Sequence, residues 1–203
     1  MNNPRIGRQI PHYEAVEIQS VDAVFSSDKL FRYLLSMRFR KNLIDTERNK
    51  SVVVILKNPS AADEKLADAT IRKVETFVYN RFTDAGNLHI VNIFAFRATE
   101  PGDLNSTFAS RGAGSVVGPE NDHVIMKAIS DADYIIIAWG NNSGIDKNMY
   151  GERVFTMKQL LRQTKLSKIY HVAGTKKTIQ PLHGLMWGYN YSIEPAIEFL
   201  QDT

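Results

Sequence analysis

Four stretches of the chain are almost continuously apolar, and polar or small residues follow each of them. Hydrophobicity that is continuous rather than alternating indicates burial on both faces, which is typical of parallel strands covered by helices. We therefore predict four buried strands at residues 51–57, 88–94, 133–139 and 168–173.

Amphipathic helical patterns lie between these strands. In the first of them, Ile71, Val74, Phe77 and Val78 fall on one helical face, and Asp68 precedes it as an N-cap. Strands that alternate with helices build βαβ units. The pattern predicts an α/β fold, a three-layer α/β/α sandwich with a short, mainly parallel, four-stranded central sheet. The three predicted helices lie within residues 69–82, 120–132 and 152–164.

The remaining segments are less regular. Residues 1–13 carry two prolines and read as an irregular N-terminal arm, so we assign residues 14–203 to a single domain. Residues 14–40 mix β-branched and aromatic side chains, which predicts a hairpin or a short helix. Residues 99–119 hold four glycines and little apolar periodicity. We expect a long loop there, and such loops in compact domains usually serve function or are mobile.

Composition narrows the classes of protein and site. The 203 residues include 43% hydrophobic and 23% charged side chains and no cysteine. This excludes disulfides, thiolate zinc sites and cysteine nucleophiles, and it fits a reducing compartment. The N-terminal stretch lacks an apolar signal segment, and no apolar run is long enough to cross a membrane, so we expect a cytoplasmic protein. The net charge of +3 permits a polyanionic partner without requiring one.

Polar side chains gather just past the predicted strands. Ligands of open α/β sheets bind outside the carboxyl ends of the strands, so these positions predict the site. Asn92 lies inside an apolar strand and needs a polar partner there. Structural roles remain open for each: turns for Asn58, core contacts for Asn92 and Trp139, a surface ion pair for Arg97. The candidates are Asn58, Ser60 and Asp63, then Asn92 and Arg97, then Trp139, and finally Lys176, Lys177 and His183.

Several mechanisms lack their sequence fingerprints. The chain contains neither the P-loop pattern nor the Gly-x-Gly-x-x-Gly of dinucleotide-binding folds. It also lacks the Gly-x-Ser-x-Gly of α/β hydrolases. No spacing of histidines suggests a metal site. We therefore expect no metal and no cofactor.

Six short blocks resemble an uncharacterised domain family of bacteria and their phages. They occur in the family's order between about Phe31 and Leu185. The blocks are Asn58-Pro59-Ser60-Ala61-Ala62-Asp63, Asp68-Ala69-Thr70-Ile71-Arg72, Val91-Asn92-Ile93-Phe94-Ala95-Phe96-Arg97-Ala98-Thr99, Gly118-Pro119-Glu120-Asn121-Asp122, Ala138-Trp139-Gly140 and Thr175-Lys176.

More distantly, the same blocks resemble the uracil-DNA glycosylase superfamily. Asn58 before Pro59 is similar to the polar residue that ends the first strand there, which is Asn in the mismatch-specific branch. Asn92 and Arg97 match an Asn that reads the base edge and a basic residue that follows it. His183 is similar to the histidine that opens the last motif, although Gly184 replaces the usual Pro.

The resemblance implies a uracil-DNA-glycosylase-like hydrolase that cleaves the N-glycosidic bond of a modified, mismatched or deaminated base. Its partner would be DNA or a nucleotide. Asn58 would orient water and His183 would stabilise the leaving base. Arg97, Lys176 and Lys177 would hold phosphates. The implied residues are Asn58 and His183 for catalysis; Asn92, Arg97, Asp63 and Trp139 for the base or nucleotide; and Ser60, Arg72, Lys176 and Lys177 for phosphate.

Two further functions stay open at this point. The chain could bind a nucleotide or nucleic acid on the same fold without cleaving it, which predicts salt-sensitive retention of DNA with no product. It could also be a hydrolase or transferase of a free modified nucleotide, which predicts indifference to duplex length. The modest net charge favours a small ligand over a long duplex.

Overall fold

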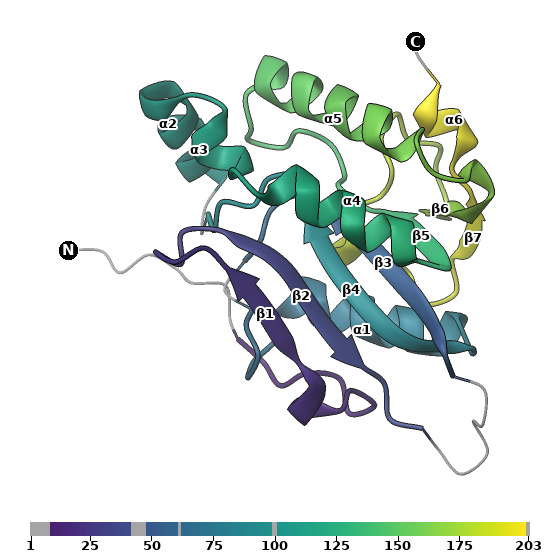
Figure 1. The fold of residues 1–203 in the computed structure, drawn as a ribbon. Helices are drawn as coiled ribbons and strands as arrows, with labels where there is room; N and C mark the ends of the chain where they lie inside the picture. The colour runs from purple at the N-terminus through teal and green to yellow at the C-terminus, as the bar shows by residue number, and fades with distance from the viewer. Residues whose placement is uncertain (1–8, 42–47, 61, 99–100, 202–203) are drawn as a thin grey trace.

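The computed structural model describes residues 9–41, 48–60, 62–98 and 101–201 (Figure 1). Within these ranges seven strands form one sheet, in the order β1-β2-β4-β3-β5-β6-β7. The four central strands β4, β3, β5 and β6 run parallel, and the outer pairings are antiparallel. The strands are β1 (Asp22–Phe25), β2 (Arg32–Arg38), β3 (Lys50–Leu56), β4 (Ala85–Asn92), β5 (Tyr134–Ile137), β6 (Ile169–Ala173) and β7 (Ser192–Pro195).

The four continuously apolar stretches form the four parallel strands, but the prediction of a four-stranded sheet is wrong. β1, β2 and β7 extend the sheet at its two edges. β1 and β7 are four residues long, and none of their residues is buried. Such short, exposed edge strands carry no continuous apolar run, which is why the hydrophobic pattern does not reveal them. Residues 14–40 contain the β1–β2 hairpin and also a 3-10 helix, η1 (Ile18–Ser20).

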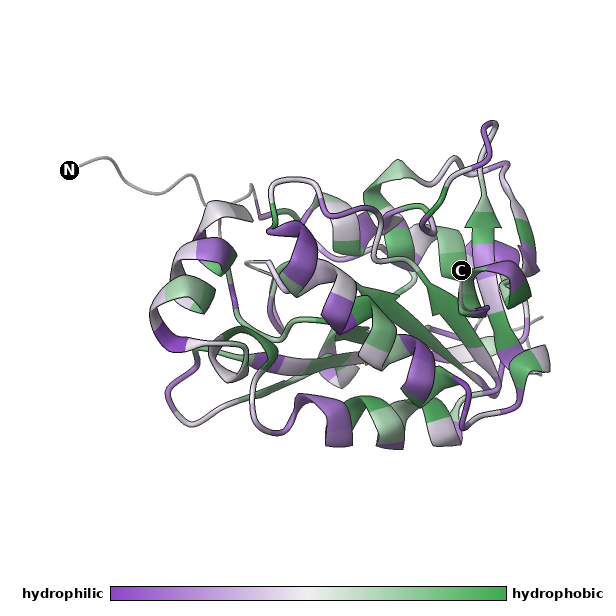
Figure 2. Ribbon diagram, turned by 90° about the horizontal axis from the view of Figure 1, so that it is seen from above, coloured by the Kyte–Doolittle hydropathy of each residue, from purple (hydrophilic) through white to green (hydrophobic). Residues whose placement is uncertain are grey.

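Helices cover both faces of the sheet and make three layers. α1 packs with η3 on one face, while α4 and α5 lie over the other. Successive β3 side chains enter the two cores alternately: Val52 and Val54 face α1, and Val53 and Ile55 face α4 and α5. Figure 2 shows the apolar strands between helices whose outer faces are polar. The helices are α1 (Ala69–Arg81), α2 (Pro101–Arg111), α3 (Gly114–Val117), α4 (Asn121–Asp131), α5 (Lys147–Leu161), α6 (Ile197–Leu200), η2 (Leu166–Lys168) and η3 (Gly184–Met186).

The predicted loop 99–119 is mostly helical where it is described, so that prediction is wrong. It forms α2 and α3, which meet at Gly112, whose φ of +80° suits glycine. Leu104 and Val116 are buried against the core, and the rest of α2 is largely polar. Two apolar anchors in so polar a stretch give little periodicity, which explains the wrong prediction. The predicted start of α5 is also corrected: Asp146 accepts hydrogen bonds from the N–H groups of Asn148 (3.0 Å) and Met149 (2.9 Å) and caps it.

The segment before β1 is held to α1 by a buried histidine. His12 Nδ1 contacts Glu75 Oε1 at 2.5 Å, and His12 Nε2 donates to the Asp63 carbonyl at 3.1 Å. The Tyr13 N–H donates to Glu75 Oε2 at 2.7 Å. A carbonyl cannot donate, so when Glu75 is ionised both bonds of the ring form together only if His12 is protonated. Burial lowers the pKa of His12, but the hydrogen bond and charge of Glu75 outweigh burial and leave the pKa raised.

A raised folded-state pKa makes the contribution of His12 to stability depend on pH. That contribution is complete below the unfolded pKa of about 6.5 and is lost as pH rises through the folded value. We expect His12→Gln to cost about 3 kcal/mol of unfolding free energy at pH 5.5 and distinctly less at pH 9. Urea titrations of both proteins at the two pH values measure this difference, and an equal cost at both would contradict the protonated pair.

Candidate functional site

The carboxyl ends of β3 and β4 place Asn92 at the centre of the candidate site. Asn92 is the last residue of β4 and pairs with Leu56, the last residue of β3. Paired residues of a sheet point to the same face, and Leu56 belongs to the core beneath α1. The Asn92 side chain is 0% exposed, and neither its Nδ2 nor its Oδ1 has a hydrogen-bond partner among the described residues. An enclosed amide without partners costs about 1–3 kcal/mol for each unmet group.

A β-bulge turns a second polar side chain to the same face. In the β1–β2 pairing, Val24 lies opposite Leu34 and Phe25 lies opposite Arg32, which leaves Tyr33 as an extra residue. Leu35 faces the core beneath α1, so strict alternation would turn Arg32 to the other side. The extra residue reverses this, and Arg32 Nη1 reaches the Ala62 carbonyl at 2.5 Å. Bulges often re-aim side chains next to functional sites in this way.

The Arg32 guanidinium is buried and only partly bonded. The residue is 1% exposed, and its Nε and Nη2 have no partner among the described residues. Burial lowers the pKa of Arg32 to about 10, with the charge of Asp68 opposing and that of Arg97 reinforcing this shift. The guanidinium is therefore cationic at neutral pH. An enclosed cation without an ion-pair partner is an unusual and costly arrangement.

Arg97 lies close enough to Arg32 for the two charges to repel. Its N–H donates to the Leu30 carbonyl at 3.0 Å, and its Nη1 donates to the Lys29 carbonyl at 3.4 Å. The guanidinium carbon lies 4.9 Å from the centre of the Phe25 ring. The β1–β2 hairpin thus fixes Arg97 beside the site, while its buried Nε keeps no partner.

Lys57, directly after β3, lies near enough to His183 for its charge to act on the ring, and His183 lies against Gly140 in the segment after β5. Lys57 is 9% exposed, burial lowers its pKa, and no ion pair among the described residues involves it. Burial, and after it the charge of Lys57, lower the pKa of His183 to about 4. His183 Nδ1 accepts from the Leu185 N–H at 3.3 Å, so the neutral ring carries its proton on Nε2. A neutral N–H donor next to a buried cation suits a ligand atom with partial negative charge.

The loop after β3 is largely occupied by its own structure. Asn58 is partly buried, and its Nδ2 donates to the Pro59 carbonyl at 3.3 Å. Ser60 Oγ donates to Asp68, whose other oxygen accepts from the Ile71 N–H at 2.9 Å and caps α1. Asp63 Oδ1 accepts from the N–H groups of Lys65 and Leu66, both at 2.9 Å. Both oxygens of Asp68 are therefore engaged, whereas Asp63 has only its Oδ1 engaged.

Other candidates lie in structural positions. Trp139 is 0% exposed in the core beneath α4 and α5, and its Nε1 donates to Gln180 Oε1 at 3.0 Å. Arg72 donates to the carbonyls of Pro11 (2.8 Å) and His12 (2.9 Å). These hydrogen bonds within the chain give Trp139 and Arg72 structural roles.

Lys176 and Lys177 lie apart from this group, on the exposed segment after β6. Lys177 pairs with Glu198 at 3.4 Å. Both lysines line a separate cavity of about 310 Å³ with His171 and Phe199. The structure does not join them to Asn92 by any described contact.

Sequence reasoning missed Arg32 and Lys57. Arg32 stands between apolar and aromatic residues in the stretch Phe31 to Leu35, where a charged residue is a signal in itself. Alternation alone would have assigned it to the wrong face, because the bulge at Tyr33 cannot be read from the hydrophobic pattern. Lys57 is a charged residue directly after a buried strand, and this position could have marked it as a candidate.

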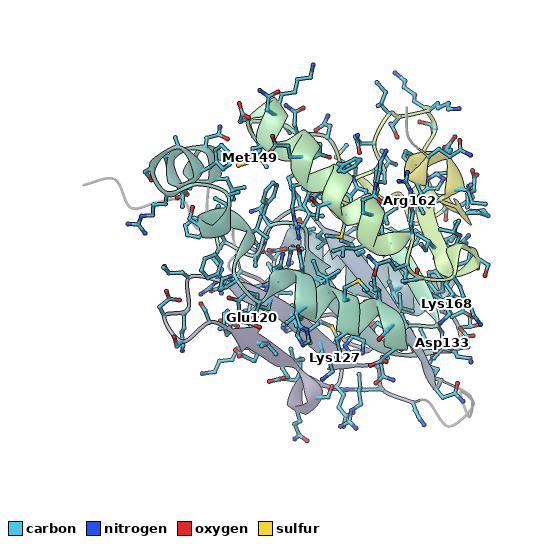
Figure 3. The ribbon with its side chains drawn as sticks, turned by 45° about the horizontal axis from the view of Figure 1, so that its top comes forward. Glu120, Lys127, Asp133, Met149, Arg162 and Lys168 are labelled. Carbon is cyan, nitrogen blue, oxygen red and sulfur yellow. The ribbon has the colours of Figure 1, made fainter. Side chains whose placement is uncertain are left out.

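The opposite end of the sheet carries ordinary structural pairs. Lys50 Nζ lies 3.0 Å from Asp133 Oδ1, and Lys168 Nζ donates to the Ala132 carbonyl at 2.6 Å. Figure 3 shows Asp133 and Lys168 together at this end, far from Met149 near the start of α5. A cleft of about 880 Å³ also lies at this end, beside Arg38 and Gly86. Two of its lining residues, Lys41 and Arg48, flank the undescribed residues 42–47, and we base no site on it.

A protein-family comparison identifies the chain. Residues 32–185 match the family described as "Protein of unknown function (DUF1643)". The chain belongs to this family. The match covers the range over which the sequence blocks resemble an uncharacterised family, and it carries no activity with it. No curated protein matches the chain.

Among solved structures, one similar chain is a metallo-carboxypeptidase from Pseudomonas aeruginosa in complex with (2-guanidinoethylmercapto)succinic acid. Its identity to this DUF1643 chain is 16%, and the TM-score is 0.32. The alignment covers 81% of this chain and 48% of the carboxypeptidase. A similarity this weak supports no conclusion about the DUF1643 protein.

The described residues contain no cluster of three or more histidine, aspartate or glutamate side chains that could hold a metal ion. Within the same residues, every helix is too short or too polar to cross a membrane.

A substitution at Gly140 tests the close contact between the segment after β5 and His183. Its φ is +70°, and an added Cβ would lie 2.9 Å from His183 Cβ. We expect Gly140→Ala to lower the unfolding free energy by about 1–3 kcal/mol, because both the backbone and the contact become strained. Gly151→Ala in α5 is the matched control: no atom lies within 4 Å of its added Cβ, and a small gain in stability is expected. Equal effects of the two substitutions in denaturant titrations would refute the contact.

Proposed function

We propose that this DUF1643 protein recognises a nucleobase, carried by a nucleotide or turned out of DNA, at the carboxyl ends of β3 and β4. The observation that carries the proposal is the Asn92 amide, which is fully buried at a strand end with both polar atoms unpartnered. One carboxamide presents a donor and an acceptor side by side. This pattern complements the hydrogen-bonding edge of a base, as in enzymes that read a flipped base.

The surrounding charges support the same ligand class. Arg32 is a buried cation without an ion-pair partner among the described residues, and Arg97 adds a second positive charge nearby. Lys57 is a further buried cation, directly after β3. A ligand that carries a phosphate next to a base would satisfy both the amide and the cations. The distant resemblance to uracil-DNA glycosylases is consistent with this ligand but rests on sequence blocks alone.

We further propose N-glycosidic bond cleavage as the reaction at this site. Cleavage creates a cationic sugar and an anionic base, and the neutral Nε2–H of His183 can donate to that base. A water molecule oriented by Asn58 would add to the sugar carbon, and the proton that it loses would pass to the departed base anion. Since Asn58 accepts that proton poorly and both oxygens of Asp68 are engaged, catalysis would be slow. The same occupancy favours binding without cleavage as the alternative function.

Asn92→Leu separates a binding role from a structural role. Leucine has a similar volume and no polar atoms, so the unmet amide disappears. We expect the unfolding free energy to rise by about 1–3 kcal/mol while binding of deoxynucleoside monophosphates is lost. Denaturant titration and calorimetric binding measure the two effects. Asn87→Leu, a half-buried position on the same strand, should leave binding unchanged. Strong destabilisation by Asn92→Leu would mean that the amide serves the fold.

Oligonucleotides with a panel of modified, mismatched and deaminated bases test the reaction. After incubation and alkaline treatment, strand scission reports an abasic site. We expect scission with at least one base, reduced about 100-fold in Asn58→Ala and in His183→Ala. Asn80→Ala and His123→Ala, both exposed, are the controls. Retention of DNA without scission would support binding alone.

A further inference from the structure

The arginine at the bulge presents one specific edge of its guanidinium without a partner. Arg32 Nη1 is bonded to the Ala62 carbonyl, while the free atoms are Nε and Nη2. These two N–H groups are adjacent and parallel, and together they form the fork that binds two oxygens of a phosphate or carboxylate. The bond to Ala62 fixes the plane of the group, so the fork has a fixed direction.

Nearby carboxylates do not fill this fork. Asp68 is engaged by the Ile71 N–H and the Ser60 hydroxyl, and Asp63 by the N–H groups of its own turn. Asp68, Asp63 and Glu64 act on Arg32 only through space, and no ion pair among the described residues includes it. Arg97 contributes repulsion and a further buried, unpartnered Nε. An anion bound at the fork would offset the repulsion between the two guanidinium groups.

We propose that Arg32 binds the terminal phosphate of a nucleotide, so that the ligand of this site is a mononucleotide and not an uncharged nucleoside. The proposal rests on the proposed recognition of a base by Asn92, which lies on the same face of the sheet. Arg32 is 1% exposed, so its fork is more accessible to the end of a small ligand than to a continuous strand. A doubly charged phosphate also matches the charges of Arg32 and Arg97 better than a carboxylate does.

The test compares ligands that differ by one phosphate. Calorimetry on the full chain would use the deoxynucleoside 5′-monophosphates, including that of deoxyuridine, the matching nucleosides, inorganic phosphate and a single-stranded oligonucleotide. We expect the preferred nucleotide to bind at least tenfold more tightly than its nucleoside. Arg32→Lys keeps a charge but loses the fork, and it should reduce nucleotide binding to the level of the nucleoside. Arg38→Met, an exposed position on the same strand, is the matched control and should change nothing.

The outcomes distinguish this proposal from the proposed base recognition. If nucleoside and nucleotide bind the wild type equally, the phosphate site is refuted while base recognition stands. If inorganic phosphate binds through Arg32 but no nucleoside or nucleotide is preferred over it, the phosphate site stands and base recognition fails. Binding of the oligonucleotide alone, lost in Arg32→Lys, would assign the fork to a phosphodiester of DNA and overturn the mononucleotide. Should Arg32→Lys fail to fold, the comparison of ligands on the wild type still decides.

Discussion

The parallel pairing of β3 with β4 is the constraint on which the candidate site depends. Its register sets Asn92 beside Leu56, so the amide must point into the core beneath α1. A register shift of one residue would turn Asn92 to the other face of the sheet. It would also move every side chain of β4 into the opposite core. The packing of Val54 and Ile90 in the core beneath α1 therefore sets the face to which the Asn92 amide points.

The bulge at Tyr33 brings the second residue of the candidate site, Arg32, from β2, which runs antiparallel to β4. β2 runs antiparallel to β4, so its first residue, Arg32, arrives at the end of the sheet where β4 finishes. Without the extra residue, the guanidinium would enter the apolar core beneath α4 and α5. The bulge and the register together explain how residues distant in sequence reach the same end and the same face of one sheet.

The hydrophobic pattern predicted the central architecture because burial on both faces leaves a continuous apolar signature. It predicted the four parallel strands, α1 and its Asp68 cap, and the end of the sheet where Asn92 lies. It left open a hairpin or a short helix at residues 14–40, where the β1–β2 hairpin and η1 lie. It could not predict β7, none of whose residues is buried, nor α2, which has few apolar anchors. Arg32 was missed for a different reason: its direction depends on a bulge, and a bulge is a property of two paired strands.

Two buried polar groups beneath the same sheet show why the site is assigned to Asn92 and Arg32. His12 and Glu75 are equally buried, yet both ring nitrogens of His12 and both carboxylate oxygens of Glu75 have a hydrogen-bond partner within the chain. These bonds join the segment before β1 to α1. Asn92 and Arg32 have four enclosed side-chain atoms between them with no such partner. Each unmet buried atom costs stability, and the four atoms of Asn92 and Arg32 are the observation from which the proposed ligand site is argued.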